Sequence, residues 1–266
     1  MSIIEAIILG AVQGITEFLP ISSDGHLVLA GVLLGREEEG TLAMTVLLHL
    51  GSLLAIAITF RRDIVALLWP RIDWHAWLVL FVASIPAAIV GFTLKLFIPN
   101  STEAWIEKEV MQSPVWAGFG LLFTAGVLWC AEIKRVPEVG VATVAGSRYW
   151  GVLLIGFAQA LAMLPGVSRS GSTISLALNL RWLRPEALKL SFLMGLIAIG
   201  GAGLIEAKEI SNIEPGPGFA GFASSLLFSL VGLNAIKLIV AKAKLRWFAC
   251  YCALAGLAAL IWLALR

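Results

Sequence analysis

Long apolar stretches recur along the whole chain, and they constrain its fold more than any other feature of the sequence. A helix crosses the hydrocarbon core of a bilayer with about 20 mainly apolar residues. Six stretches approach that length: 43–60, 76–98, 114–131, 190–207, 218–240 and 248–265. Hydrophobic residues make up 59% of the 266 positions and charged residues 14%, whereas soluble domains carry roughly 45–50% and about 25%. Because so few polar groups cannot cover a soluble globule, we expect one all-α, polytopic integral membrane domain over residues 1–266.

The loops between these stretches differ in the sign of their charge, and this difference predicts their sides of the membrane. Four loops are basic: 61–75, 132–149, 181–189 and 241–247. Two loops are acidic: 99–113 and 206–217. Because cytoplasmic loops carry an excess of Lys and Arg, we expect the basic loops in the cytoplasm, and the acidic loops and both termini outside. The formal net charge is only +2, so no nucleic-acid partner is expected.

Two further apolar segments, 2–35 and 150–180, are interrupted by Pro, Gly, Ser and charged residues. Basic loops flank 150–180 on both sides, so the chain enters and leaves this segment on one face of the membrane, as a re-entrant hairpin does. At a shift of 146 residues the two segments match at four polar or glycine positions: Gly10 with Gly156, Gln13 with Gln159, Ser22 with Ser168, and Gly25 with Gly171. Each segment is followed by three of the six apolar stretches, and the two sets of three begin on opposite sides of the membrane.

This pattern favours an inverted-topology repeat, made of residues approximately 1–145 and 146–266. The expected architecture has about six transmembrane helices plus two re-entrant helical hairpins. Interrupted helices in such repeats place a polar site near the membrane midplane. The alternative is a bundle of eight ordinary spans with kinks.

The first interrupted segment carries the polar run QGITEFLPISSDGH, from Gln13 to His26. Polar groups at membrane depth are costly, so function is their default explanation. Gln13 and Glu17 share one helical face at i, i+4 spacing, and Pro20 ends that helix before a Ser-Ser-Asp-Gly turn. A carboxylate, two hydroxyls and an imidazole can supply a metal ligand, a nucleophile and a proton-transfer group. The alternative is a serine N-cap with His26 at an interface.

The second interrupted segment carries PGVSRSGST over residues 165–173. Its spacing resembles a phosphate loop that lacks the lysine, so nucleotide hydrolysis is not expected. Its small residues still allow backbone N–H groups to converge on an oxyanion, and a following helix N-terminus adds a favourable dipole. Arg169 adds a planar fork that grips two phosphate oxygens. The alternative is a structural ion pair between Arg169 and Glu17.

Together, GITEFLPISSDGH and LPGVSRSGST resemble the motifs of the undecaprenyl-diphosphate phosphatase family, also known as the bacitracin-resistance family. The resemblance covers essentially the whole chain, including HLGSLLAI from His49 to Ile56. It implies a membrane phosphatase that hydrolyses undecaprenyl diphosphate to undecaprenyl phosphate and inorganic phosphate, recycles the carrier lipid of cell-wall synthesis and confers bacitracin resistance. It also implies a divalent cation, Mg²⁺ or Ca²⁺, a place in the bacterial inner membrane, and an active site facing the periplasm or cell exterior.

The same resemblance assigns three sets of residues in this sequence. The catalytic set is Ser23, His26, Glu17 and Arg169. The set that binds the diphosphate is Ser22, Ser168, Arg169, Ser170, Gly171 and Thr173. The metal set is Glu17, Gln13 and Asp24. Gln13 stands where a glutamate is common in the family and Asp24 where Thr or Ser is usual, so Asp24 is expected to supply the missing charge.

The resemblance leads to one mechanistic expectation and one rival function. Ser23 is expected to be the nucleophile, with His26 as the adjacent base, while attack by His26 or by water stays open. The expected partners are the polyprenyl diphosphate and the surrounding membrane lipid, and a homodimer is compatible with the sequence. The rival function is a flippase for undecaprenyl phosphate, since transporters also use inverted repeats. A carrier, however, needs neither a nucleophile nor an acid–base group.

Overall fold

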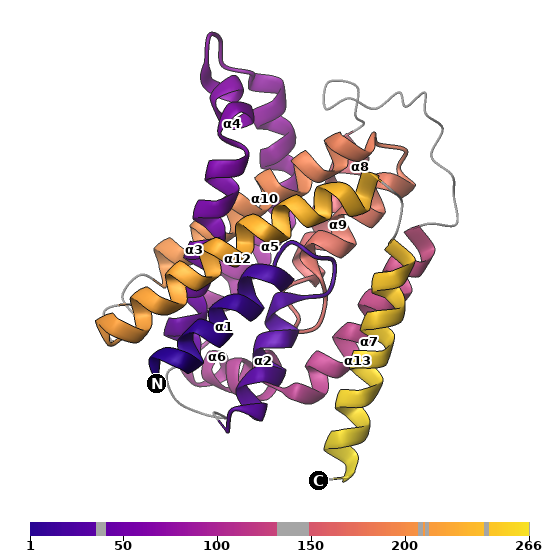
Figure 1. The fold of residues 1–266 in the computed structure, drawn as a ribbon. Coiled ribbons are helices and arrows are strands. Elements are labelled where there is room, and N and C mark those ends of the chain that lie inside the picture. The colour runs from indigo at the N-terminus through magenta and orange to yellow at the C-terminus, as the bar shows by residue number, and fades with distance from the viewer. Residues whose placement is uncertain (36–40, 132–148, 207–209, 211–212, 242–244, 266) are drawn as a thin grey trace.

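A computed structural model describes residues 1–35, 41–131, 149–206, 210, 213–241 and 245–265. Every regular element in these ranges is a helix (Figure 1). The helices long and apolar enough to cross a bilayer are α5 (Trp74–Leu96), α7 (Pro114–Ala131), α10 (Arg184–Ile205), α12 (Pro215–Ala241) and α13 (Leu245–Leu265). A sixth candidate is α3 (Thr41–Thr59) taken together with α4 (Arg61–Leu68), which is bent away from it by 69°. Five of the six stretches predicted from the sequence are therefore confirmed as helices of spanning length, and the stretch 43–60 is helical and reaches that length only together with α4.

The two interrupted segments form two pairs of short helices. The first pair is α1 (Ile3–Thr16) and α2 (Ser23–Leu33), and the second is α8 (Tyr149–Leu161) and α9 (Arg169–Asn179). None of the four is long enough to span a bilayer alone, and the two helices of each pair contact each other. The same cap begins the second helix of each pair. Ser22 Oγ accepts a hydrogen bond from Gly25 N at 3.3 Å, and Ser168 Oγ accepts one from Gly171 N at 3.0 Å.

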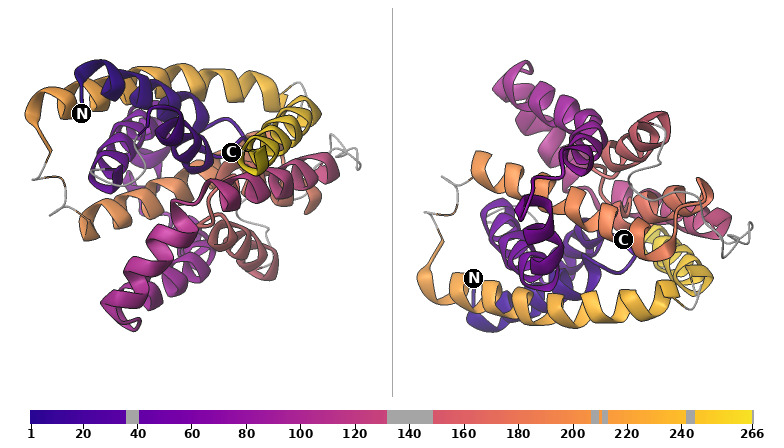
Figure 2. Two further views of the ribbon diagram at one scale, coloured as in Figure 1. Left: turned by 90° about the horizontal axis from the view of Figure 1, so that it is seen from below. Right: turned by 90° about the horizontal axis from the view of Figure 1, so that it is seen from above.

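The first helix of each short pair packs against a helix from the other part of the chain. Helix α1 lies along α12 and α8 lies along α5, while α3 packs on α10 and α7 on α13. Both views of Figure 2 show α12 running along one side of the molecule beside α1. Glycine permits the close contact at matching positions, because a Cβ on Gly10 would lie 2.4 Å from Gly221 O and one on Gly156 would lie 2.4 Å from Ala83 O. The contact of α1 with α12 and that of α8 with α5 therefore correspond to each other.

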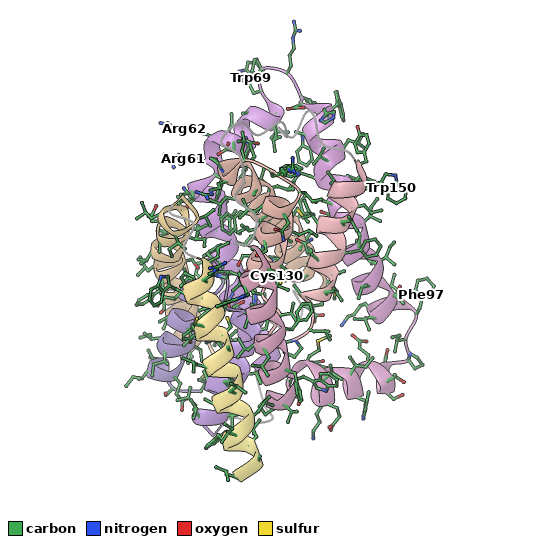
Figure 3. The ribbon with its side chains drawn as sticks, turned by 90° about the vertical axis from the view of Figure 1, so that its right-hand side faces the viewer. Arg61, Arg62, Trp69, Phe97, Cys130 and Trp150 are labelled. Atoms are coloured by element: carbon green, nitrogen blue, oxygen red, sulfur yellow. The ribbon has the colours of Figure 1, made fainter. Side chains whose placement is uncertain are left out.

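The outside of the bundle is strongly apolar. Large side chains such as Phe97, Trp150 and Trp69 are 79%, 77% and 73% exposed, and Figure 3 shows them pointing away from the helices. A surface of this kind fits a hydrocarbon solvent and not water. Together with the spanning helices, it makes the chain a multi-pass membrane protein.

The two ends of the bundle differ as the loop charges predict. Figure 1 places α4 at one end, and both termini with α6 (Asn100–Ile106) at the other. A short π-helix, Glu107–Met111, follows α6 and completes the acidic loop. The arginines Arg61 and Arg62 project from the α4 end (Figure 3). The basic loops 132–149 and 241–247 fall mostly outside the described residues.

Candidate active site

The two hairpins meet at a buried ion pair. Glu17 directly follows α1, and Arg169 is the first residue of α9. Arg169 Nη2 lies 2.6 Å from Glu17 Oε1, and the two side chains are 14% and 5% exposed. Arg169 Nη1 also donates to the carbonyl oxygen of Ser191 on α10, at 3.0 Å. Removing one partner of a buried pair costs about 3–5 kcal/mol, so this contact ties the halves of the chain together.

The ion pair leaves the arginine able to bind a further anion. A guanidinium carries five N–H donors, and the bonds to Glu17 and Ser191 use two of them. The structural ion pair that the sequence offered as an alternative is therefore present, and it is compatible with phosphate binding by Arg169.

Ser23 shares the carboxylate of Glu17 with the arginine. The Ser23 hydroxyl donates to Glu17 Oε2 at 2.6 Å, and Ser23 is buried. The preceding residue, Ser22, has a φ of 67° and caps α2. A positive φ is uncommon for a residue other than glycine, and here it turns the chain sharply from Pro20 into α2. A hydroxyl, a carboxylate and a guanidinium are thereby placed in one row.

The arginine loop is held by hydrogen bonds from the neighbouring helices. Thr124 on α7 accepts from Ser168 N at 2.9 Å and donates to Gly166 O at 2.8 Å. Ser170 Oγ donates to Leu19 O at 3.2 Å, and so joins this loop to the first hairpin. Thr173 Oγ1 lies 2.7 Å from Ser191 Oγ. Of the predicted diphosphate-binding residues, Ser22, Ser168, Ser170, Gly171 and Thr173 are all buried around Arg169.

The turns of the two hairpins touch through glycine backbone. A Cβ added to Gly25 would lie 2.8 Å from Gly166 Cα and 3.0 Å from Gly166 N. Gly166 itself has a φ of 85°, a conformation that glycine adopts readily. Larger residues would force the hairpins apart at the level of Ser23 and Arg169.

His26 lies beside this row without joining it. Its Nδ1 is 2.7 Å from Ser22 O, and its Nε2 is 2.8 Å from the hydroxyl of Tyr251 on α13. The Ser23 hydroxyl instead bonds to Glu17. The geometry therefore pairs Ser23 with a carboxylate, where the sequence predicted a histidine. The serine N-cap of the alternative interpretation is present, at Ser22.

The residues predicted to bind a metal lie around Glu17 and His49. Gln13 Nε2 donates to Glu17 Oε2 at 3.1 Å and lies 3.5 Å from Ser52 Oγ. His49 on α3 approaches two carboxylates, with Nε2 at 3.6 Å from Glu17 Oε2 and 3.5 Å from Asp24 Oδ1. The Asp24 side chain is 46% exposed, so the site opens to its surroundings there.

Sequence reasoning missed several residues that complete this site: His49, Ser52, Thr124, Ser191 and Tyr251. His49 and Ser52 stand in HLGSLLAI, three residues apart on one face of an apolar helix. Two polar residues on one face at membrane depth indicate a functional site, so these two could have been predicted. Thr124, Ser191 and Tyr251 are single polar residues in three separate spans, and nothing local distinguishes them. Only the packing of α7, α10 and α13 brings them to the hairpins.

The fold and the site define a class: a multi-pass membrane protein that holds a serine, a carboxylate and an arginine between two short helical hairpins. Comparison with known proteins agrees with this class and narrows it. The sequence model described as bacitracin resistance protein BacA matches residues 6–258, and the chain belongs to that family.

Three relatives that match this chain over nearly its full length share one name. The protein named undecaprenyl-diphosphatase from Methanosphaera stadtmanae is 36% identical over 285 residues, which cover 98% of each chain. Proteins with the same name from Desulfosudis oleivorans and Geobacter sulfurreducens are each 36% identical, over 289 and 281 residues, and both alignments cover 100% of each chain.

Proposed function

We propose that the protein is an undecaprenyl-diphosphatase, which hydrolyses undecaprenyl diphosphate to undecaprenyl phosphate and inorganic phosphate and thereby confers resistance to bacitracin. The observation that carries this proposal is the row formed by Ser23, Glu17 and Arg169. A hydroxyl bonded to a carboxylate is a nucleophile with its base in place, and an adjacent guanidinium suits a phosphoryl group. The relatives' shared name supports the lipid substrate.

In the first step, Arg169 holds the oxygens of the terminal phosphate and Ser23 Oγ attacks its phosphorus. The Ser23 proton passes to Glu17 Oε2, which lies 2.6 Å away. The new Oγ–P bond forms as the bond to the bridging oxygen breaks, and undecaprenyl phosphate leaves. Each contact that stabilises charge in the transition state contributes on the order of 3 kcal/mol.

In the second step, water releases phosphate from Ser23. We assign His26 as the base that takes the proton of this water, since it lies on the same turn as Ser23, one helical turn further along α2. Glu17 returns its proton to Ser23 Oγ as the Oγ–P bond breaks. His26 then passes the proton that it has taken to the departing phosphate, and the enzyme is back in its starting state.

The residues next to Glu17 fit a divalent cation chemically. Gln13 Oε1 is buried and has no hydrogen-bond partner among the described residues, and Asp24 and Glu17 add carboxylate oxygens. The described residues contain no group of three or more His, Cys, Asp and Glu side chains arranged for a metal. Mg²⁺ is commonly held by only one or two carboxylates together with substrate phosphates. Glu17, Asp24 and Gln13 would hold the ion, which would supply charge neutralisation on the diphosphate.

Hydrolysis is favoured over lipid transfer by the bond between Ser23 and Glu17, because a carrier has no use for an activated hydroxyl. We propose that the α4 end faces the cytoplasm, since it carries Arg61, Arg62 and Arg71, and that the site opens towards the periplasm or cell exterior. The inverted-repeat relation between residues 1–145 and 146–266 is supported by the matched serine caps and by the corresponding contacts of α1 with α12 and of α8 with α5.

The test is phosphate release from undecaprenyl diphosphate by the purified protein in detergent. We expect turnover by the wild type and none by Ser23→Ala. The matched control is Ser84→Ala, which removes a hydroxyl that, among the described residues, donates to Leu80 O of its own helix. Saturable lipid transfer between vesicle leaflets without phosphate release would contradict the proposal and favour the flippase. Loss of activity with a chelator and recovery with Mg²⁺ would support the cation, while full activity in excess chelator would contradict it.

A further inference from the structure

The C-terminal helix reaches the first hairpin through two consecutive residues. Helix α13 packs mainly along α7. Tyr251 places its hydroxyl 2.8 Å from His26 Nε2, and Cys252 Sγ lies 3.8 Å from the carbonyl oxygen of Pro20. These contacts touch both ends of the turn that carries Ser23. Helix α13 therefore contacts this turn at both of its ends.

The hydrogen bonds of His26 fix its tautomer. The Ser22 carbonyl oxygen, 2.7 Å from Nδ1, can only accept a hydrogen bond, so Nδ1 carries the ring proton. In the neutral ring Nε2 then holds a lone pair, and the Tyr251 hydroxyl donates to it. The two rings are nearly parallel, at 10°, with centroids 5.7 Å apart. The ring is thus held from its own turn on one side and from a distant helix on the other.

We infer that Tyr251 positions His26 in the phosphatase reaction and relays a proton to it: its hydroxyl donates to the lone pair of Nε2, so the proton of the attacking water reaches Nε2 through that hydroxyl. This inference rests on the role proposed above for His26. Tyr251 is 45% exposed and lies on an outer helix, so a purely structural requirement for its hydroxyl is not expected. Its effect passes through His26 and not through the substrate.

The kinetic test compares Tyr251→Phe with Tyr149→Phe. Tyr149, the other tyrosine of the chain, is equally exposed at 45% and lies beside a histidine as well, His75, with ring centroids 6.2 Å apart. We expect Tyr251→Phe to lower kcat about five- to tenfold, as the loss of one hydrogen bond does, while KM stays within twofold because no substrate contact is lost. Tyr149→Phe should change neither constant.

A double-mutant cycle shows whether the effect passes through His26. In a His26→Ala background, Tyr251→Phe should cause no further loss of kcat. A full additional loss in that background, or an unchanged kcat for Tyr251→Phe alone, would overturn the inference.

A spectroscopic test is independent of activity. The chain contains three histidines, so ¹⁵N-histidine labelling gives few resonances, and His26→Ala assigns those of His26. We expect a protonated Nδ1 and a hydrogen-bonded, unprotonated Nε2 whose resonance moves in Tyr251→Phe and stays in Tyr149→Phe. A protonated Nε2 in the neutral wild-type ring, or a resonance that ignores Tyr251→Phe, would overturn the inference. If the wild type released no phosphate from undecaprenyl diphosphate, the proposed function would fail, and these resonances alone would decide whether Tyr251 holds His26.

Discussion

Gly25→Ala tests whether contact between the two hairpin turns is needed for activity. The added methyl group would lie 2.8 Å from Gly166 Cα, and contact becomes ordinary only at 3.4 Å. The turns must therefore separate by at least 3.0 − 2.8 = 0.2 Å, and by 3.4 − 2.8 = 0.6 Å to reach ordinary contact. Both sides of the contact are backbone, so no side chain can rotate away to relieve it.

The size of the effect follows from that displacement. A misplacement of about 1 Å can cost on the order of 100-fold in rate, so a shift of this size between Ser23 and Arg169 should lower kcat/KM about tenfold. Overpacking costs about 1–3 kcal/mol, and replacing a helical glycine by alanine returns about 1 kcal/mol. We therefore expect a thermal midpoint that is unchanged or moderately lower, in a protein that still folds.

The assay measures phosphate release and thermal unfolding in detergent for Gly25→Ala and for Gly126→Ala. Gly126 lies on α7, and a Cβ there would meet nothing within 4 Å, so this control keeps its activity and gains the helical preference of alanine. If Gly25→Ala kept kcat/KM within twofold of the wild type, the contact between the turns would not position the reacting groups.

Three further predictions concern single residues. Arg169→Lys should lose at least about tenfold in turnover, or roughly 1.4 kcal/mol, because lysine lacks the planar guanidinium that binds two phosphate oxygens. Near-normal activity would show that Arg169 acts only through its positive charge. Gln159→Leu should leave the thermal midpoint unchanged or raised, because neither amide atom of Gln159 has a hydrogen-bond partner among the described residues; a large destabilisation would contradict this. Gln13→Leu, in contrast, should lower activity by removing the hydrogen bond to Glu17. On a cysteine-free background, Arg71→Cys and Glu107→Cys should react with an impermeant thiol reagent from opposite faces of the membrane; reaction of both from one face would refute the predicted topology.

Much of the fold is encoded locally. The long apolar helices are predicted by the length of the apolar stretches alone, and the interruptions at Pro20 and Pro165 predict the two hairpins. The caps at Ser22 and Ser168 follow from serine preceding a helix. The ion pair between Glu17 and Arg169 could be predicted as an alternative, because a buried arginine requires an anionic partner.

The rest depends on packing between distant segments. The spacing of Ser23 and His26 in the sequence suggested that these two residues act on each other. In the structure, the positive φ at Ser22 turns the Ser23 hydroxyl towards Glu17, and the imidazole of His26 bonds to the Tyr251 hydroxyl. Tyr251 is 225 residues from His26 along the chain. No local pattern predicts such a contact, because it depends on how α13 lies against α2 and α7.

Ser23 carries the phosphoryl group during hydrolysis in the proposed mechanism, and this step can be tested by trapping the phosphorylated intermediate. The substrate is undecaprenyl diphosphate with a radiolabelled terminal phosphate, and His26→Ala is used because it should slow the second step and accumulate the intermediate. After rapid quenching without acid, the account predicts label on the peptide that contains Ser23, and none in the Ser23→Ala/His26→Ala double variant. Label on His26 in the wild type, or hydrolysis at normal rates by Ser23→Ala, would contradict the account and point to attack by histidine or by water.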